Sequence, residues 1–129
     1  MKKHAWISWL FYLGFVYDAV LGVAFLLFGD QVFEWYNVTP PNHWGYMQFP
    51  AGLLIVFALL YLAVARDPVA NRNLIPYGAL LKVCYCAVVF GHALKNNIPA
   101  MWIPFAWFDL CFLVLFLIAY AQLKPAKAA

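Results

Sequence analysis

Four long apolar runs follow one another along the chain, and short polar stretches separate them. The runs are Trp6–Phe28, Trp44–Ala65, Leu74–His92 and Met101–Leu123. Each has close to the ~20 residues that an α-helix needs to cross the hydrocarbon core of a bilayer. Within lipid a helix satisfies its own backbone hydrogen bonds, whereas an irregular segment does not. The pattern therefore predicts an all-α fold, a four-helix transmembrane bundle in which successive helices are antiparallel.

The composition favours the same environment. Hydrophobic residues make up 67% of the 129 residues and charged residues only 10%, against roughly 45–50% and about 25% in soluble domains. A chain this short has too little interior to hide so much apolar side chain from water. The four runs use most of the sequence, so we expect residues 1–129 to form a single integral membrane domain with the lipid bilayer as its partner.

Basic residues gather at one set of ends of the four runs. Positive residues are enriched on the cytoplasmic side of membrane proteins, and this set comprises Lys2, Lys3, Arg66, Arg72, Lys124 and Lys127. Both termini and the central loop are therefore predicted to be cytoplasmic, in a multi-pass protein of the inner (plasma) membrane. Because these charges lie at helix ends, the net charge of +3 is not interpreted as a nucleic-acid-binding surface, and no nucleic-acid partner is expected.

Two of the connections carry local signals. Residues 29–43 form the longest connection, in which Pro40 and Pro41 stop any helix. Apolar and aromatic residues at 32–36 indicate a short turn in the membrane interface, either a lid over an outward opening or a plain connector. In the basic loop, Asn73 is the expected N-cap of the third helix, with Pro76 in its first turn.

Three charged residues interrupt the apolar runs: Asp18, Lys82 and Asp109. A charge at membrane depth is costly, so it is paired, protonated or turned toward a wet cavity. A rise of about 1.5 Å per residue places the three within about one helical turn of one another in depth. Because side chains lean toward the N-terminus of their helix, Asp18 should lean toward Lys82 and form a salt bridge. Asp109 should lean away, which leaves it a hydrogen bond, a protonated state or a water-filled pocket.

These three residues are the predicted buried polar centre, and three interpretations stay open. The charges could lock helices together, serve as a functional centre for protons or a small ligand, or meet another subunit. Gly14 and Gly22 share a face with Asp18 and are interpreted as packing positions, because small residues let helices approach closely. The expected secondary polar contacts, of which Gln48 should point inward, are Gln48, Tyr85 and His92.

No familiar catalytic motif is present in the sequence. It contains no glycine-rich phosphate loop, no HExxH and no nucleophile–base pair with recognisable spacing. Cys84 and Cys86 are about 200° apart around a helix, which argues against a redox pair. We therefore predict no catalytic residue and no metal site, and whether the chain is an enzyme stays open, with an independent enzyme less favoured.

The layout resembles the small four-helix membrane proteins of the DoxX-like group. The resemblance rests on a first helix running into Phe28 and Gly29, the long outer loop, the basic turn at 66–72 and the mid-helix Lys82. Some members of that group are associated with quinone-linked oxidation of sulfur compounds. The resemblance therefore implies an accessory or assembly subunit of a membrane redox or respiratory system, with a quinone as cofactor. The alternative is a small proton- or ligand-coupled transporter, and a homo-oligomer or a larger complex would fit either function.

Overall fold

The computed structural model describes residues 4–124. They form four α-helices: α1 (Ala5–Trp35), α2 (Gly45–Arg66), α3 (Ile75–Leu94) and α4 (Ile103–Gln122). Short 3₁₀ turns, η1 (Arg72–Leu74) and η2 (Ala100–Trp102), lead into α3 and α4. All four helices are long and apolar enough to cross a membrane. The prediction of an all-α fold with four apolar helices is confirmed, and it is compatible with a small integral membrane protein.

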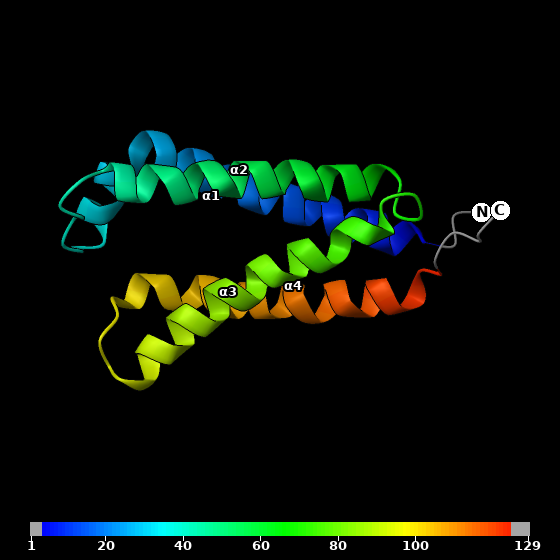
Figure 1. Cartoon of the computed structure of the whole chain (residues 1–129). Helices are drawn as coiled ribbons and strands as arrows, with labels where there is room; N and C mark the ends of the chain where they lie inside the picture. Colours follow the sequence, from blue (N-terminus) through cyan, green and yellow to red (C-terminus); the bar gives the residue numbers. More distant parts are fainter. Residues whose placement is uncertain (1–3, 125–129) are drawn as a thin grey trace.

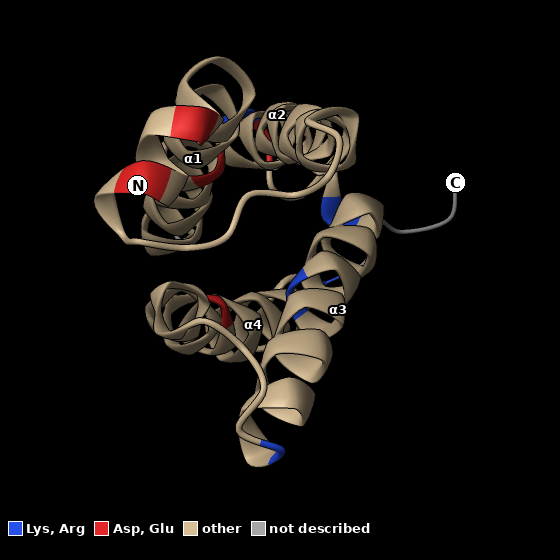
Figure 2. Cartoon of the chain, turned by 90° about the vertical axis from the view of Figure 1, so that its left-hand side faces the viewer, with Lys and Arg blue, Asp and Glu red and all other residues tan. Residues whose placement is uncertain are grey.

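The helices are arranged as two pairs (Figure 1). Helices α1 and α2 lie side by side along their lengths, and α3 and α4 form the second pair. Helix α3 starts beside the end of α2 and then runs obliquely across α4, away from α2 (Figure 2). The connections 36–44 and 95–99 lie at one end of the molecule, and the turn 67–71 lies at the other (Figure 1). Three of the basic residues that are predicted to be cytoplasmic, Lys2, Lys3 and Lys127, lie outside the described residues.

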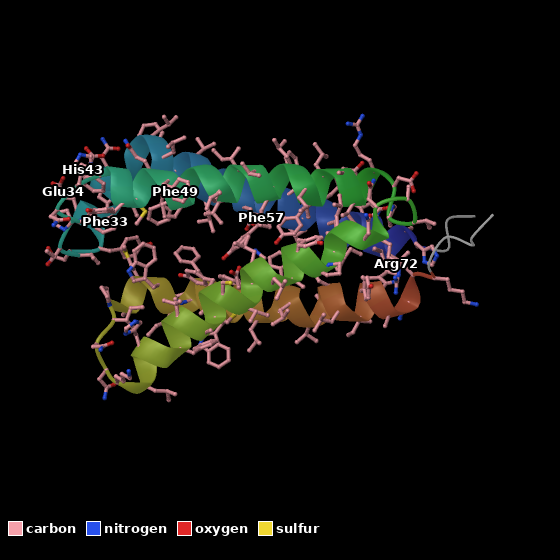
Figure 3. The ribbon with its side chains drawn as sticks, in the orientation of Figure 1. Phe33, Glu34, His43, Phe49, Phe57 and Arg72 are labelled. Atoms are coloured by element: carbon pink, nitrogen blue, oxygen red, sulfur yellow. The ribbon has the colours of Figure 1, made fainter. Side chains whose placement is uncertain are left out.

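The first helix is longer than the sequence pattern indicates. It passes a kink at Phe28, where φ is −127° and ψ is 23°, and continues to Trp35. The prediction of a loop from residue 29 is therefore wrong for residues 29–35. The extension is held by Phe33, which is buried and packs edge-on against Trp44 and Trp102 with ring centroids 5.5 and 5.8 Å apart. Figure 3 shows Phe33 at the end of the bundle that carries the connections 36–44 and 95–99.

A tightly packed core fills the opposite half of the bundle and draws on all four helices. At its centre the ring of Phe116 stacks on Phe11 with centroids 4.4 Å apart, and Tyr61 lies 5.1 Å from Phe116. All three are fully buried. Because lipid tails are as apolar as these side chains, close packing rather than escape from water holds such helices together.

Glycines bring α1 and α2 into close contact. A Cβ atom on Gly22 would lie 2.8 Å from Ile55 Cγ1 and 2.9 Å from the carbonyl oxygen of Ala51. A Cβ on Gly14 would lie 3.3 Å from the ring of Phe116 on α4 and 3.5 Å from the ring of Tyr61 on α2. The interpretation of both glycines as packing positions is confirmed, since only hydrogen fits at Gly22 without a shift of α2.

The start of α3 differs from its predicted capping. Asn73 lies inside η1, the N-cap position of α3 is Leu74, and no side chain caps it. The predicted N-cap is therefore wrong. Instead, the Asn71 side chain donates to the carbonyl oxygens of Ala63 (2.9 Å) and Asp67 (3.2 Å). Asn71 thus satisfies carbonyls at the end of α2 and fixes the turn that separates the two helix pairs.

Arg72 ties this turn to the end of α4. Its Nε donates to the carbonyl oxygens of Tyr120 (3.2 Å) and Leu123 (2.6 Å). Its guanidinium lies 3.7 Å from the centre of the Tyr120 ring, a cation–π contact. A positive group is favourable at the C-terminal end of a helix, where carbonyl groups lack partners. Figure 3 shows Arg72 at the end of the molecule opposite Phe33.

Candidate functional site

Asp18, Lys82 and Asp109 come together near the middle of the bundle and are called the ion cluster below. Lys82 Nζ on α3 donates to Asp18 Oδ1 on α1 at 2.9 Å and to Asp109 Oδ1 on α4 at 3.1 Å. The exposed fractions of Lys82, Asp18 and Asp109 are 0%, 1% and 7%. The predicted contact between Asp18 and Lys82 is present. The prediction that Asp109 leans away from Lys82 is wrong, because one ammonium group bridges both carboxylates.

Aromatic rings surround the ammonium group of Lys82. Its Nζ lies 5.2 Å from the ring centre of Phe112 and 5.4 Å from those of Tyr17 and Tyr61. The negative faces of such rings attract a cation, so the lysine is held by π-systems as well as by carboxylates. Sequence reasoning missed Tyr17 and Tyr61, although Tyr17 directly precedes Asp18 and brings a hydroxyl group into an apolar run.

Two polar atoms at the cluster lack hydrogen-bond partners among the described residues. They are Asp18 Oδ2 and Tyr17 Oη, and both are buried. Leaving a buried donor or acceptor unpaired costs about 1–3 kcal/mol, so such atoms are rare in folded proteins. Asp18 therefore uses one carboxylate oxygen for Lys82 and keeps the other free for a further contact.

A cavity of about 580 Å³ borders the cluster and is called the pocket below. Asp18 and Asp109 form part of its wall, while nearly all its other lining side chains are apolar or aromatic and come from all four helices. Its volume lies within the range of roughly 300–1,000 Å³ that is typical of small-molecule sites. At one end Phe25 and Trp102 stack with centroids 5.5 Å apart. The pocket therefore combines an apolar interior with two carboxylates at one side.

The pocket opens between α2 and α3. The exposed residues in its wall are Pro50 and Leu53 on α2 and Cys84 and Val88 on α3. These two helices are close at the turn 67–71 and diverge along their lengths (Figures 1 and 2). Because lining side chains on both helices are exposed, this side of the pocket is open at the surface of the described residues.

The three secondary residues have different positions. Tyr85 lines the pocket, and its Oη donates to the carbonyl oxygen of Trp102 at 2.9 Å. Gln48 is exposed and its side chain makes no hydrogen bond within residues 4–124, so the prediction that it points inward is wrong. His92 is also exposed, with Nδ1 3.0 Å from Asn97 Oδ1, and lies apart from the cluster. Only Tyr85 belongs to the site.

Other chemistry is sparse in the part of the chain that the structure describes. No group of three or more His, Cys, Asp or Glu side chains within it could hold a metal ion. Cys84 is exposed, whereas Cys86 is buried with its Sγ 3.4 Å from the carbonyl oxygen of Ala106. The two thiols thus lie on different sides of α3, and the carboxylates beside the pocket are the main candidates for ligand recognition.

Comparison with known proteins adds no assignment. No family model matches the chain, and neither the curated proteins nor the solved structures include a significant match. The function of the chain therefore has to be inferred from the ion cluster and the pocket.

Proposed function

We propose that this chain is a multi-pass membrane protein that binds a small lipid-soluble molecule in the pocket. One observation carries the proposal: the buried residues Asp18 and Asp109 line a cavity of about 580 Å³ whose other walls are almost entirely apolar. In small-molecule sites, apolar walls provide contact area and a few polar groups fix orientation and specificity. Ionisable side chains at membrane depth commonly mark such sites.

The proposed placement in the membrane explains how a ligand reaches the pocket. We place four antiparallel helices in the inner membrane, with both termini and the turn 67–71 in the cytoplasm. Three basic residues at this end of the molecule support the orientation: Arg66 at the end of α2, Arg72 in η1 before α3, and Lys124 just after α4. The opening between α2 and α3 then faces the acyl chains, so a lipid-soluble molecule enters sideways from the bilayer.

Photolabelling in proteoliposomes tests this function. The probe is a phenyldiazirine with a short alkyl chain that ends in a hydroxyl group. Saturable labelling is expected in peptides that contain Leu53 and Val88, both of which line the pocket. Val88→Trp should abolish this labelling by filling the opening. Val114→Trp should leave it intact, because Val114 is similarly exposed, at 49% against 58%, and does not line the pocket.

The proposal fails if labelling rises linearly with probe concentration on every exposed helix face, or if both tryptophan variants behave alike. The first result would indicate simple partition of the probe into lipid. The second would indicate a binding site elsewhere. Equal amounts of folded protein, checked by helical circular dichroism, are needed for the comparison.

The accessory-subunit hypothesis rests on the resemblance to DoxX-like proteins and has a separate test. A quinone is a lipid-soluble molecule whose reduced form carries hydroxyl groups that can donate to a carboxylate, so binding of the reduced form in the pocket would unite the two hypotheses. Purification in mild detergent should then recover a larger oxidoreductase together with this chain. Recovery of the chain alone, or as a homo-oligomer, would leave ligand binding as the better-supported function.

A further inference from the structure

The ion cluster contains more negative than positive groups. Two carboxylates surround one ammonium group, so their ionised forms carry a summed charge of −1. Every other Lys and Arg within residues 4–124 lies in a loop or at a helix end. The remaining titratable side chains that face the cluster are neutral in their ordinary forms: Tyr17 from α1, Tyr61 from α2, and Tyr85 and Cys86 from α3. A second positive group is therefore missing from the site.

The free atom at the cluster is an acceptor. Asp18 is 1% exposed, its Oδ2 has no partner among the described residues, and the residue lines the pocket. An ionised carboxylate oxygen can only accept hydrogen bonds. A ligand group that satisfies this atom must donate, which excludes ketones, ethers and carboxylates as the recognised group.

We propose that the pocket takes a lipid-soluble amine in its protonated form. This inference rests on the proposed function and names the chemical class of the ligand. The apolar body of the amine occupies the apolar part of the pocket, and its ammonium group donates to Asp18 Oδ2. Such charge-assisted hydrogen bonds are roughly twice as strong as neutral ones. The added positive charge also brings the summed charge of the site to zero.

Three photoprobes with one apolar body test the inference. They carry an ammonium, a hydroxyl or a carboxylate group at the end of the same phenyldiazirine alkyl chain. At neutral pH the amine should reach half-saturation in the pocket at a concentration at least about tenfold lower than the alcohol, a difference of about 1.4 kcal/mol. The carboxylate probe should give no saturable labelling, because it would add a negative charge beside Asp18 and Asp109.

Variants of the two carboxylates locate the recognition. Asp18→Asn and Asp109→Asn each leave one carboxylate paired with Lys82 and remove the excess negative charge. Each should reduce the preference for the amine to less than about twofold, while labelling by the alcohol persists. Asp30→Asn is the matched control, because Asp30 is exposed on α1 outside the pocket. If one variant fails to fold, the other provides the same measurement.

The outcomes separate this inference from the proposed function. The inference is overturned if the amine and the alcohol have equal half-saturating concentrations, or if the preference for the amine survives in both Asp18→Asn and Asp109→Asn. In either case, saturable labelling of the pocket still upholds the proposed function. Absence of saturable labelling by every probe overturns both. A preference for the amine that depends on Asp18 and Asp109, and that Asp30→Asn leaves unchanged, supports both.

Discussion

Replacing Lys82 by methionine removes the ammonium group and keeps an unbranched apolar side chain of similar length. Asp18 and Asp109 then remain buried without their shared partner. The Oδ1 atoms of the two carboxylates lie at most 6.0 Å apart, the sum of their distances of 2.9 and 3.1 Å to Nζ. The variant therefore converts a bridged cluster into two like charges in an apolar interior.

The distances give the relative cost of each change. With an effective dielectric constant of about 20, the attractions at 2.9 and 3.1 Å are about 6 and about 5 kcal/mol, and the carboxylate repulsion at 6.0 Å is about 3 kcal/mol. Lys82→Met loses both attractions and keeps the repulsion. A single Asp→Asn loses one attraction but also removes the repulsion, and its amide oxygen still accepts from Lys82. We therefore expect about 3–5 kcal/mol of destabilisation for Lys82→Met and about 2 kcal/mol for Asp18→Asn or Asp109→Asn.

Reversible unfolding by sodium dodecyl sulfate in mixed micelles, followed by tryptophan fluorescence, measures these free energies. The double variant with asparagine at both positions should cost more than the two single changes together, because it leaves the Lys82 ammonium without a counter-ion. The reasoning is refuted if Lys82→Met lies within about 1 kcal/mol of the native protein. It is also refuted if the two asparagine changes simply add.

The same titration checks three contacts elsewhere in the bundle. Gly22→Ala should cost about 1–3 kcal/mol because its Cβ would meet α2 at under 3 Å, whereas Gly52→Ala, with no atom within 4 Å, should be neutral or slightly stabilising. Arg72→Gln should cost about 2 kcal/mol by releasing the carbonyls at the end of α4, whereas Arg66→Gln should change little because Arg66 is exposed. Tyr61→Phe should cost about 1 kcal/mol, since its Oη loses a buried 2.9 Å hydrogen bond to a carbonyl of α3. Equal changes in the free energy of unfolding for the two glycine variants would contradict the packing argument for α1. Equal changes for the two arginine variants would contradict the role of Arg72 at the end of α4.

The helices could be predicted because lipid imposes a strong constraint on sequence. An apolar run of about 20 residues has one stable form in a bilayer, and all four runs form helices. The charged residues could be placed at similar depth because the rise of a helix is fixed. The extension of α1 could not be predicted from its own residues. Residues 29–35 are helical because Phe33 packs on Trp44 and Trp102, and both tryptophans lie outside this segment of the sequence.

Neither the bridging role of Lys82 nor the presence of the pocket could be predicted from the sequence, for related reasons. The lean of a side chain along its helix gives a direction for Asp109, but a lysine has a flexible four-carbon stem and three donors and can reach two carboxylates. The pocket arises because α3 turns away from α2 (Figure 2), and no local pattern in either helix encodes that angle. Its apolar lining residues look in sequence like any lipid-facing surface.

A variant in which all three residues of the ion cluster are apolar distinguishes two roles of the cluster. These roles are to lock the helices together and to recognise a ligand. Asp18 belongs to one helix pair and Lys82 and Asp109 to the other, so the cluster joins the pairs whatever else it does. Replacing all three by leucine or methionine removes all three charges together and leaves none without a partner, and such replacements of buried ion networks are often neutral or stabilising. We expect the free energy of unfolding of the triple variant to be at least that of the native protein. We also expect the variant to bind the alcohol and amine probes equally. A triple variant that is stable and still prefers the amine would show that ligand recognition lies elsewhere, whereas one that does not fold would show that this joint needs its charges.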